Sequence, residues 1–489
     1  MTDKRFMVLG VDYQPGGQGA DFSKGDPLSN GTTCLRDAAL MQNLGVNTIR
    51  SYNLNPNLNH DECMSIFNSV GIYLILDVNT PNSGEHLDRS DPSSTYNKEY
   101  LEHVFTMIEA FKDYPNTLAF FSGNEVMNDV ESSKANPPYI RALQREMKSY
   151  ISSNANRTIP VGYSAADGMI DRRWPSLRAF HTDIIPVREV LEDTWEYLQC
   201  DNSDNEDGTD KSRSDFFGLN SYSWCGSSAT FESSGYDVLV ETFSNSTIPV
   251  FFSEYGCNEV TPRTFDEVPT LYGEKMTVMS GGLIYEWTQE PNNYGIIETY
   301  SNGSAQLRGD YDALMDKYSK LNLTLLEDHN TTATNLKAPK CSSGLIGDNG
   351  VSTDFDLPAV PSGVADLISS GVDKKAQGSI VPVTKTAVDV PVFATGGGKI
   401  SGLKISPGDG SNRTSGGLST DAPSSTPTGS GGNGSDSGSG SGSDSNGASS
   451  TSDGSDASST AASDSAAGRA AIANGAAMGA LVGLALFAL

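Results

Sequence analysis

The sequence has few of the residues that most often bind metals or carry nucleophilic chemistry. It contains five scattered histidines, and none of its six cysteines stands in a C-x-x-C pair. No Ser/His/Asp arrangement is recognisable. We therefore expect neither a metal nor an organic cofactor.

Basic residues are also scarce. The chain has 33 Lys and Arg against 61 Asp and Glu, which gives a formal net charge of −28. A surface this acidic repels phosphate backbones, so we expect no nucleic acid partner. The charge favours solubility but selects no substrate, because a neutral polysaccharide is indifferent to it.

Apolar residues make up 37% of the chain, below the roughly one half that is usual for globular domains. The deficit is local, because residues 1–345 have the pattern of a globular domain. We expect residues 346–409 to be a mostly irregular linker, although VDVPVF (388–393) and KISGLKI (399–405) could form short strands. Residues 410–468 are dominated by Ser, Gly, Asp and Thr and cannot bury enough apolar surface to fold, which predicts a disordered, O-glycosylated stalk.

The two ends of the chain differ in their membrane-targeting signals. The first residues contain no apolar signal region of the required length, and we expect the start to be truncated. The last fourteen residues are apolar but too few to span a bilayer. They follow a short spacer and a run of small residues, so 469–489 reads as a GPI-anchor signal. We therefore expect a secreted protein anchored to the plasma membrane and present in the cell wall.

The cysteines and the glycosylation sequons also indicate an oxidising compartment. The cysteine number is even and all six lie in the globular part, which favours disulfides over free buried thiols without fixing their pairing. The N-x-S/T sequons are weak evidence alone. They begin at Asn30, Asn156, Asn245, Asn302, Asn322, Asn330, Asn412 and Asn433.

Short apolar runs alternate with helical patterns throughout the globular part. Several runs are continuously apolar, which suits parallel strands buried on both faces. Eight runs separated by helices predict an α/β fold, a (β/α)8 TIM barrel. A doubly wound open sheet is the alternative, but GGQG at 16–19 and GGGK at 396–399 lack the context of phosphate-binding loops. The eight runs are 6–12, 46–50, 72–78, 118–122, 159–163, 216–220, 248–254 and 282–287.

Polar and aromatic residues follow the predicted strands, where barrel enzymes place their active sites. Amides grip hydroxyls, aromatics stack on sugar rings, and paired carboxylates cleave glycosidic bonds, so this mixture predicts a carbohydrate-active site. The residues at these strand ends are Tyr13, Gln14, Arg50, Tyr52, Asp77, Asn79, Asn124, Glu125, Asn220, Tyr222, Glu254, Tyr255, Tyr285, Glu286 and Trp287.

Glu125 and Glu254 stand out because each ends an apolar strand, where a charge is costly. Glutamates after the fourth and seventh strands face each other across a barrel mouth. A retaining glycosidase needs two carboxyls about 5–5.5 Å apart, one protonated and one ionised. For Glu286 a purely structural place at the barrel mouth is equally plausible, whereas its neighbours Tyr285 and Trp287 are expected to line the cleft.

The motifs around these glutamates resemble those of glycoside hydrolase family 72, the fungal β-1,3-glucanosyltransferases. SGNEV (122–126) and FFSEYGC (251–257) are similar to its acid/base and nucleophile motifs. The resemblance covers residues 8–341, and no second cysteine cluster follows Cys341, so we expect the chain to resemble the members without the cysteine-rich carbohydrate-binding module that some carry. Further similar strings are GVDYQPGG (10–17), NTIRSYNLNP (47–56), LDVNTP (76–81), GLNSYSWCG (218–226) and YEWTQEPNNYG (285–295).

This resemblance implies roles and pairings for individual residues. Glu125 would be the acid/base and Glu254 the nucleophile, and Asn124 would hold the hydroxyl next to the reacting carbon. The implied disulfides are Cys34–Cys63, Cys225–Cys257 and Cys200–Cys341. The expected donor and acceptor subsites comprise Tyr13, Gln14, Arg50, Tyr52, Asp77, Tyr222, Tyr285, Trp287 and Tyr294.

The implied function is elongation of cell-wall β-1,3-glucan by cleavage and transfer, with glucan donor and acceptor chains as partners. A plain retaining endo-glycanase with the same two glutamates is the first alternative. A non-catalytic, wall-anchored glucan-binding protein is the second, and a structural mannoprotein is the third. The two-carboxylate chemistry follows from the residues, whereas transfer in preference to hydrolysis follows from the resemblance.

Overall fold

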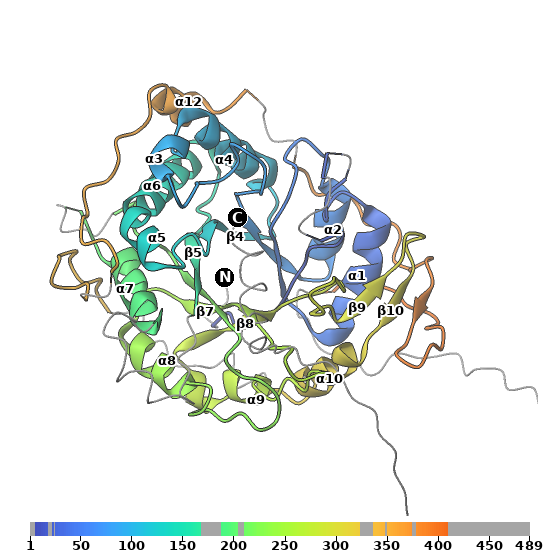
Figure 1. Cartoon of the computed structure of the whole chain (residues 1–489). Coiled ribbons are helices and arrows are strands. Elements are labelled where there is room, and N and C mark those ends of the chain that lie inside the picture. Colours follow the sequence, from blue (N-terminus) through green and yellow to red (C-terminus); the bar gives the residue numbers. More distant parts are fainter. Residues whose placement is uncertain are drawn as a thin grey trace, which may run out of the picture. The chain divides into compact units, whose positions relative to one another are not determined.

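A computed structural model describes residues 5–17, 22–23, 25–167, 187–203, 210–322, 336–347, 350–373 and 378–408. Eight parallel strands form a closed barrel in sequence order, and β1 pairs with β8 to close it (Figure 1). Every predicted apolar run supplies one strand, so the barrel is confirmed and the open sheet is excluded. The strands are β1 (Val8–Asp12), β2 (Thr48–Ser51), β3 (Tyr73–Asp77), β4 (Thr117–Asn124), β5 (Val161–Ala166), β6 (Phe217–Ser221), β7 (Val250–Tyr255) and β8 (Met279–Ile284).

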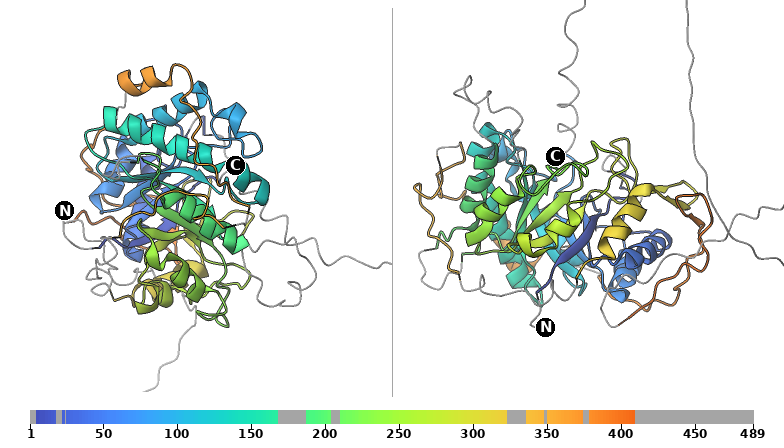
Figure 2. Two further views of the ribbon diagram at one scale, coloured as in Figure 1. Left: turned by 90° about the vertical axis from the view of Figure 1, so that its left-hand side faces the viewer. Right: turned by 90° about the horizontal axis from the view of Figure 1, so that it is seen from below.

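Helices surround the barrel, and Figure 2 shows the same arrangement from two further sides. Helix α1 begins where the Asn30 side chain accepts hydrogen bonds from the backbone N–H groups of Thr32 and Thr33, and it ends at Gly45 in the left-handed conformation. The described helices are α1 (Gly31–Leu44), α2 (Asp61–Ser69), α3 (Pro92–Thr95), α4 (Lys98–Phe111), α5 (Val130–Ala135), α6 (Pro137–Asn154), α7 (Val187–Gln199), α8 (Tyr236–Thr242), α9 (Val268–Leu271), α10 (Gly309–Tyr318) and α12 (Val364–Ser370).

Two apolar clusters hold these layers together. The larger cluster lies between the strands and the helices, and the smaller one fills the inside of the barrel. Because side chains alternate along a strand, Val8 and Asp12 of β1 face inward while Leu9 and Val11 face the helices. The inner cluster ends at Phe121, whose ring lies 4.5 Å from the Arg50 guanidinium carbon. The barrel therefore has an apolar floor on which a polar site is built.

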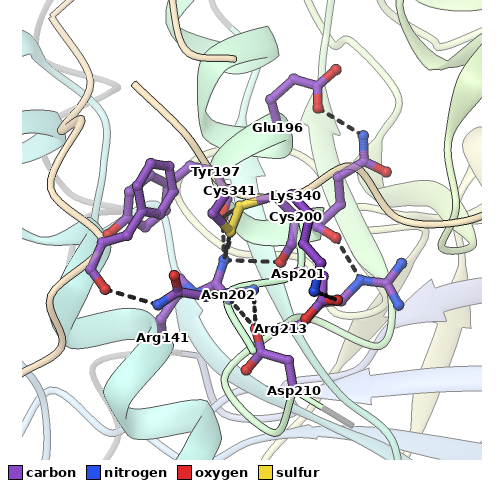
Figure 3. Close-up of a disulfide and its surroundings, with 12 residues drawn as sticks. Arg141, Glu196, Tyr197, Cys200, Asp201, Asn202, Asp210, Arg213, Lys340 and Cys341 are labelled. Atoms are coloured by element: carbon purple, nitrogen blue, oxygen red, sulfur yellow. Dashed lines mark hydrogen bonds and ion pairs between the residues drawn. A yellow bond between two sulfur atoms is a disulfide. The ribbon is translucent and has the colours of Figure 1, made fainter. Parts of the chain in front are cut away.

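Three disulfides join the cysteines in the pairs implied by the resemblance, Cys34–Cys63, Cys200–Cys341 and Cys225–Cys257. Figure 3 shows the second, which ties the end of α7 to the segment that follows the barrel. The buried guanidinium of Arg141 lies beside it and donates to the Tyr197 carbonyl at 2.7 Å and to Asp210 at 2.5 Å. This bridge encloses most of the second half of the barrel.

The described residues between 346 and 408 follow the barrel domain in sequence. They contain little regular structure, and they run along the outer helices and pack on them (orange to red in Figure 1). Helix α12 lies against α6 and α4, and the Phe355 ring stacks on Tyr197 at 4.6 Å. Near its end, Gln42 of α1 exchanges two 2.8 Å hydrogen bonds with the backbone of Ser406. We call residues 346–408 the strap.

A small three-stranded sheet stands beside α1. It contains the hairpin of β9 (Ile297–Thr299) and β10 (Ala305–Leu307), and the strap adds β11 (Val392–Phe393) parallel to β10. Of its strands, β11 lies in VDVPVF, one of the two runs that the sequence offered as possible short strands, whereas β9 and β10 were not predicted because each is only three residues long. Within the described ranges, no helix combines the length and apolar character needed to cross a bilayer. The predicted stalk and anchor signal, 410–489, lie outside those ranges.

Candidate active site

Glu125 and Glu254 lie at the carboxyl ends of β4 and β7, at the same end of the barrel. Strand pairing is irregular at both places, between Phe121 and Asn124 on β4 and between Phe252 and Tyr255 on β7. Such irregularities re-aim side chains, and Glu125 itself has a φ of +48°, in the region that side chains other than glycine rarely adopt. Both glutamates are nearly buried, with 8% and 5% of their surface exposed.

Three donors hold the Glu254 carboxylate in a fixed orientation. Tyr52 Oη donates to Glu254 Oε1 at 2.9 Å, and Tyr222 Oη donates to Oε2 at 2.7 Å. Arg50 Nη1 adds a longer contact to Oε1 at 3.3 Å. Hydrogen bonds from these donors favour the ionised form of the Glu254 carboxyl.

Glu125 has a different environment and is linked to Glu254 through amide groups. Asn220 Nδ2 donates to Glu125 Oε1 at 2.8 Å and to Asn124 Oδ1 at 3.0 Å. Arg50 Nη2 donates to the same Asn124 oxygen at 3.0 Å and thereby completes the connection to Glu254. The two carboxyls therefore belong to one hydrogen-bonded network around a common opening.

The electrostatics of the two glutamates differ in the way that acid–base chemistry requires. Burial, reinforced by the charge of Glu254, raises the pKa of Glu125 to about 7. Burial also raises the pKa of Glu254, but Arg50 and the hydroxyls of Tyr222 and Tyr52 oppose that rise. Below about pH 7, Glu125 therefore keeps its proton, whereas the donors around Glu254 favour the ionised form of that carboxyl.

Arg50 is the cation at the centre of this network. Its side chain is fully buried and binds Asp77 through two contacts, of 2.9 and 3.3 Å. Its guanidinium carbon also lies 4.2 Å from the Tyr52 ring centre. Gln14 holds the backbone that carries Tyr52, because its Oε1 accepts hydrogen bonds from the backbone N–H groups of Tyr52 and Asn53. Asp77 and Gln14 therefore position the groups that contact Glu254.

Four tyrosines gather on one side of Glu254. The ring of Tyr222 lies edge-on to Tyr285 and Tyr294, with centres 6.3 and 5.5 Å apart, and Tyr285 also meets Tyr52 at 6.5 Å. Tyr222 and Tyr294 are partly exposed. Aromatic rings with exposed faces and polar tips suit stacking and hydrogen bonding to sugar rings.

Two of the expected cleft residues lie elsewhere, and the prediction for them is wrong. Tyr13 follows Asp12 and faces outward, where its ring meets Phe67 and its hydroxyl donates to Asp37 at 3.0 Å. Trp287 is fully buried, and its ring centre lies 6.4 Å from that of Tyr311 on α10. Both belong to the packing between barrel and helices.

Glu286 is also buried, as a structural role would require. Its carboxyl accepts from Asn292 Nδ2 at 2.9 Å, and burial together with the charge of Glu290 raises its pKa to about 8. The ring of its neighbour Tyr285 contacts those of Tyr52, Tyr222 and Tyr294. Asn292 belongs to the same loop that carries Tyr294, so Glu286 helps to shape the rim of the site.

Sequence reasoning missed three buried polar residues below the network. Ser164 Oγ donates to Asn124 Oδ1 at 2.8 Å, and Ser253 Oγ donates to Asn220 Oδ1 at 2.8 Å. These serines orient the two amides that link the glutamates. Asp12 is fully buried, and burial is the main cause that raises its pKa well above the ordinary value. If side chains are taken to alternate strictly along β1, Asp12 is predicted to face the inside of the barrel and Tyr13 the helices.

Comparison with known proteins identifies the family. A family model described as "Glucanosyltransferase" matches residues 1–322, which include both glutamates and the whole barrel. The chain belongs to glycoside hydrolase family 72, the glucanosyltransferases.

Family 72 relatives match well beyond the barrel. The 1,3-beta-glucanosyltransferase gel2 of Aspergillus fumigatus is 52% identical over 406 residues, which are 83% of this chain and 80% of the relative. The probable 1,3-beta-glucanosyltransferase GAS3 of Saccharomyces cerevisiae is 49% identical over 77% of this chain and 70% of its own. The solved structure of Saccharomyces cerevisiae Gas2p with laminaritetraose and laminaripentaose has a TM-score of 0.61 and 32% identity, covering 74% of this chain and 72% of that one.

A group with metal-ligand spacing, Cys225, Cys257 and Glu259, has a different explanation. Its two cysteines are joined in a disulfide and cannot act as thiolate ligands. The chemistry of the site is therefore carried by carboxyl, amide, guanidinium and phenol groups.

Proposed function

We propose that this protein is a β-1,3-glucanosyltransferase that cleaves internal β-1,3-glucan linkages with retention and elongates cell-wall glucan. The observation that carries this proposal is the pair Glu125 and Glu254, joined by one hydrogen-bonded network in which different donors surround each carboxyl. Family membership and the names of the relatives support the choice of substrate and reaction.

In the first half-reaction, Glu125 donates its proton to the oxygen of the scissile bond while Glu254 attacks the anomeric carbon. The new reducing end is then bonded to Glu254, and the leaving chain departs. Asn124 lies between Glu125 and Arg50 and is placed to hold the hydroxyl next to the reacting carbon. In the second half-reaction, Glu125 removes a proton from the attacking hydroxyl, and the bond to Glu254 breaks.

Transfer requires that a glucan hydroxyl attacks before water does. The partly exposed rings of Tyr222 and Tyr294, with Tyr285 behind them, supply an aromatic surface next to Glu254 for an acceptor chain. A bound acceptor excludes water from the intermediate and places the non-reducing end of a second glucan at the anomeric carbon. Donor and acceptor chains are thus the partners of the site.

The cellular setting belongs to the same proposal. Three disulfides favour passage through an oxidising secretory compartment. The small-residue run, spacer and apolar tail at 463–489 support a GPI anchor in the plasma membrane. An enzyme anchored there meets its polysaccharide in the cell wall.

The test is to incubate the full chain with a reduced laminari-oligosaccharide of one defined length and to measure product lengths. A transferase forms products longer than the substrate, whereas only shorter products would make the protein a hydrolase. Glu254→Gln should abolish both products while glucan binding persists. Turnover by Glu254→Gln would refute the mechanism, and binding without any turnover by the unmodified chain would leave a glucan-binding protein.

A further inference from the structure

A cavity of about 550 Å³ lies outside the active site, between the start of α1 and the β9–β10 hairpin. Figure 1 shows α1 and the hairpin side by side. The contact between them is made by Arg36, which pairs with Asp37 and donates to the Gly303 carbonyl at 2.8 Å. The volume falls within the roughly 300–1,000 Å³ that is typical of ligand sites.

Two glycosylation sequons that are far apart in the sequence meet on this cavity. Asn30 opens the sequon N-G-T and Asn302 opens N-G-S, and both asparagines line the cavity and are exposed. The exposed sequon asparagine Asn156 does not line it. Asn30 and Asn302 therefore differ from an exposed sequon such as Asn156 in that both lie on the same cavity.

In both asparagines the hydrogen bonds described here are accepted by the side-chain oxygen Oδ1 and do not involve the nitrogen Nδ2. Asn30 Oδ1 caps α1 by accepting from the N–H groups of Thr32 and Thr33 at 3.1 and 3.2 Å. Asn302 Oδ1 accepts from the N–H and hydroxyl of Ser304 at 3.0 and 2.6 Å. An N-linked glycan is attached through Nδ2, so attachment leaves both sets of hydrogen bonds intact.

The cavity lining suits a sugar. Tyr300 stands at the hairpin tip with 42% of its surface exposed, and its ring offers a stacking face. Pro15 and Val390 add apolar surface, and the hydroxyls of Ser29 and Thr33 add polar groups. An exposed aromatic ring beside hydroxyl groups is chemistry that suits an N-acetylhexosamine.

We propose that the cavity between α1 and the β9–β10 hairpin is the seat of the protein's own N-glycans at Asn30 and Asn302, whose first sugars cover Tyr300. The glycans thereby bridge two segments that meet directly through Arg36. This inference requires passage through the secretory pathway and is independent of the catalytic roles of Glu125 and Glu254.

The experiment compares the full chain, made in a eukaryotic secretory host, with the double variant Asn30→Asp, Asn302→Asp. Aspartate keeps the capping oxygen and removes the attachment nitrogen, so the fold is preserved. Asn156→Asp adds the same kind of charge at a sequon away from the cavity and is the matched control. Glycopeptide mass spectrometry measures occupancy, and hydroxyl-radical labelling measures access to Tyr300.

We expect both cavity sequons to be occupied in the unmodified chain. Because the first sugars would cover the exposed ring, labelling of Tyr300 should rise in the double variant and stay unchanged in the control. An unoccupied Asn30 or Asn302, or equal labelling of Tyr300 in all three proteins, would overturn the proposal. So would protection of Tyr300 in the double variant by an added laminari-oligosaccharide to the level of the glycosylated chain, because the seat would then be a glucan site.

Discussion

Changing Glu125 to Gln should abolish transfer and at the same time make the fold more stable above neutral pH. Glutamine keeps the acceptor oxygen for Asn220 but cannot donate or take up the proton that the reaction moves. General acid–base groups contribute roughly 10²–10⁴-fold to rates, and transfer should fall by at least that much.

The gain in stability follows from the pKa of Glu125, which burial raises from its ordinary 4.5 to about 7. A carboxyl whose pKa is higher in the folded state stabilises the fold at low pH. That contribution is lost as the pH rises through the folded value. The shift is worth roughly 3 kcal/mol in total, of which about 2 to 3 kcal/mol develops between pH 5 and pH 8. Glutamine does not titrate and escapes this loss.

The assay is urea unfolding of both proteins at about pH 5 and pH 8, together with product lengths from a laminari-oligosaccharide. Glu267→Gln is the matched control, because burial also raises the pKa of Glu267 to about 7 although its carboxyl lies outside the network of Glu125. The control should gain stability at pH 8 and retain transfer. If Glu125→Gln and the unmodified protein lose stability in parallel between the two pH values, the protonation argument fails.

Two other changes test the contacts of Glu254 and of the strap. Tyr222→Phe removes the 2.7 Å hydrogen bond to Glu254, so the pKa of Glu254 should rise further. The acid limb of the kcat/KM profile should then move to higher pH with a loss of roughly tenfold or more, and an unmoved limb would contradict the assigned contact. Phe355→Ala removes the stack on Tyr197 and should lower the free energy of unfolding by about 1–2 kcal/mol with transfer unchanged. Val360→Ala, at an exposed position of the strap, should change neither the free energy of unfolding nor transfer, and an equal loss of stability in the two variants would rule out the stack as the cause.

The barrel and the two glutamates could be predicted because their signals are local. Each strand is a short apolar run, and a glutamate after such a run is conspicuous in one sequence. The tyrosines at 52, 222, 285 and 294 were expected from the resemblance, and the structure brings them together. Their spacing around Glu254 depends on strand ends that are far apart in the sequence.

The errors concern residues whose role depends on the direction in which the side chain points. Tyr13 and Trp287 follow strands just as Glu254 does, but their side chains pack against helices. Strand pairing is irregular on β4 and β7 just before Glu125 and around Glu254, and no residue pattern predicts such an irregularity. The packing of the strap could not be read from the sequence, because it depends on helices that come much earlier in the chain.

The packing of the strap determines how far the chain can be shortened from its C-terminal end and still fold well. A fragment ending soon after Cys341 would keep the barrel, both glutamates and all three disulfides, yet it would bare the apolar patches that Val364, Val392 and Ile405 now fill. Such exposed patches invite aggregation. Recombinant versions meant for crystals or inhibitor screens should therefore retain the chain to about Gly408, although the family match itself stops at residue 322.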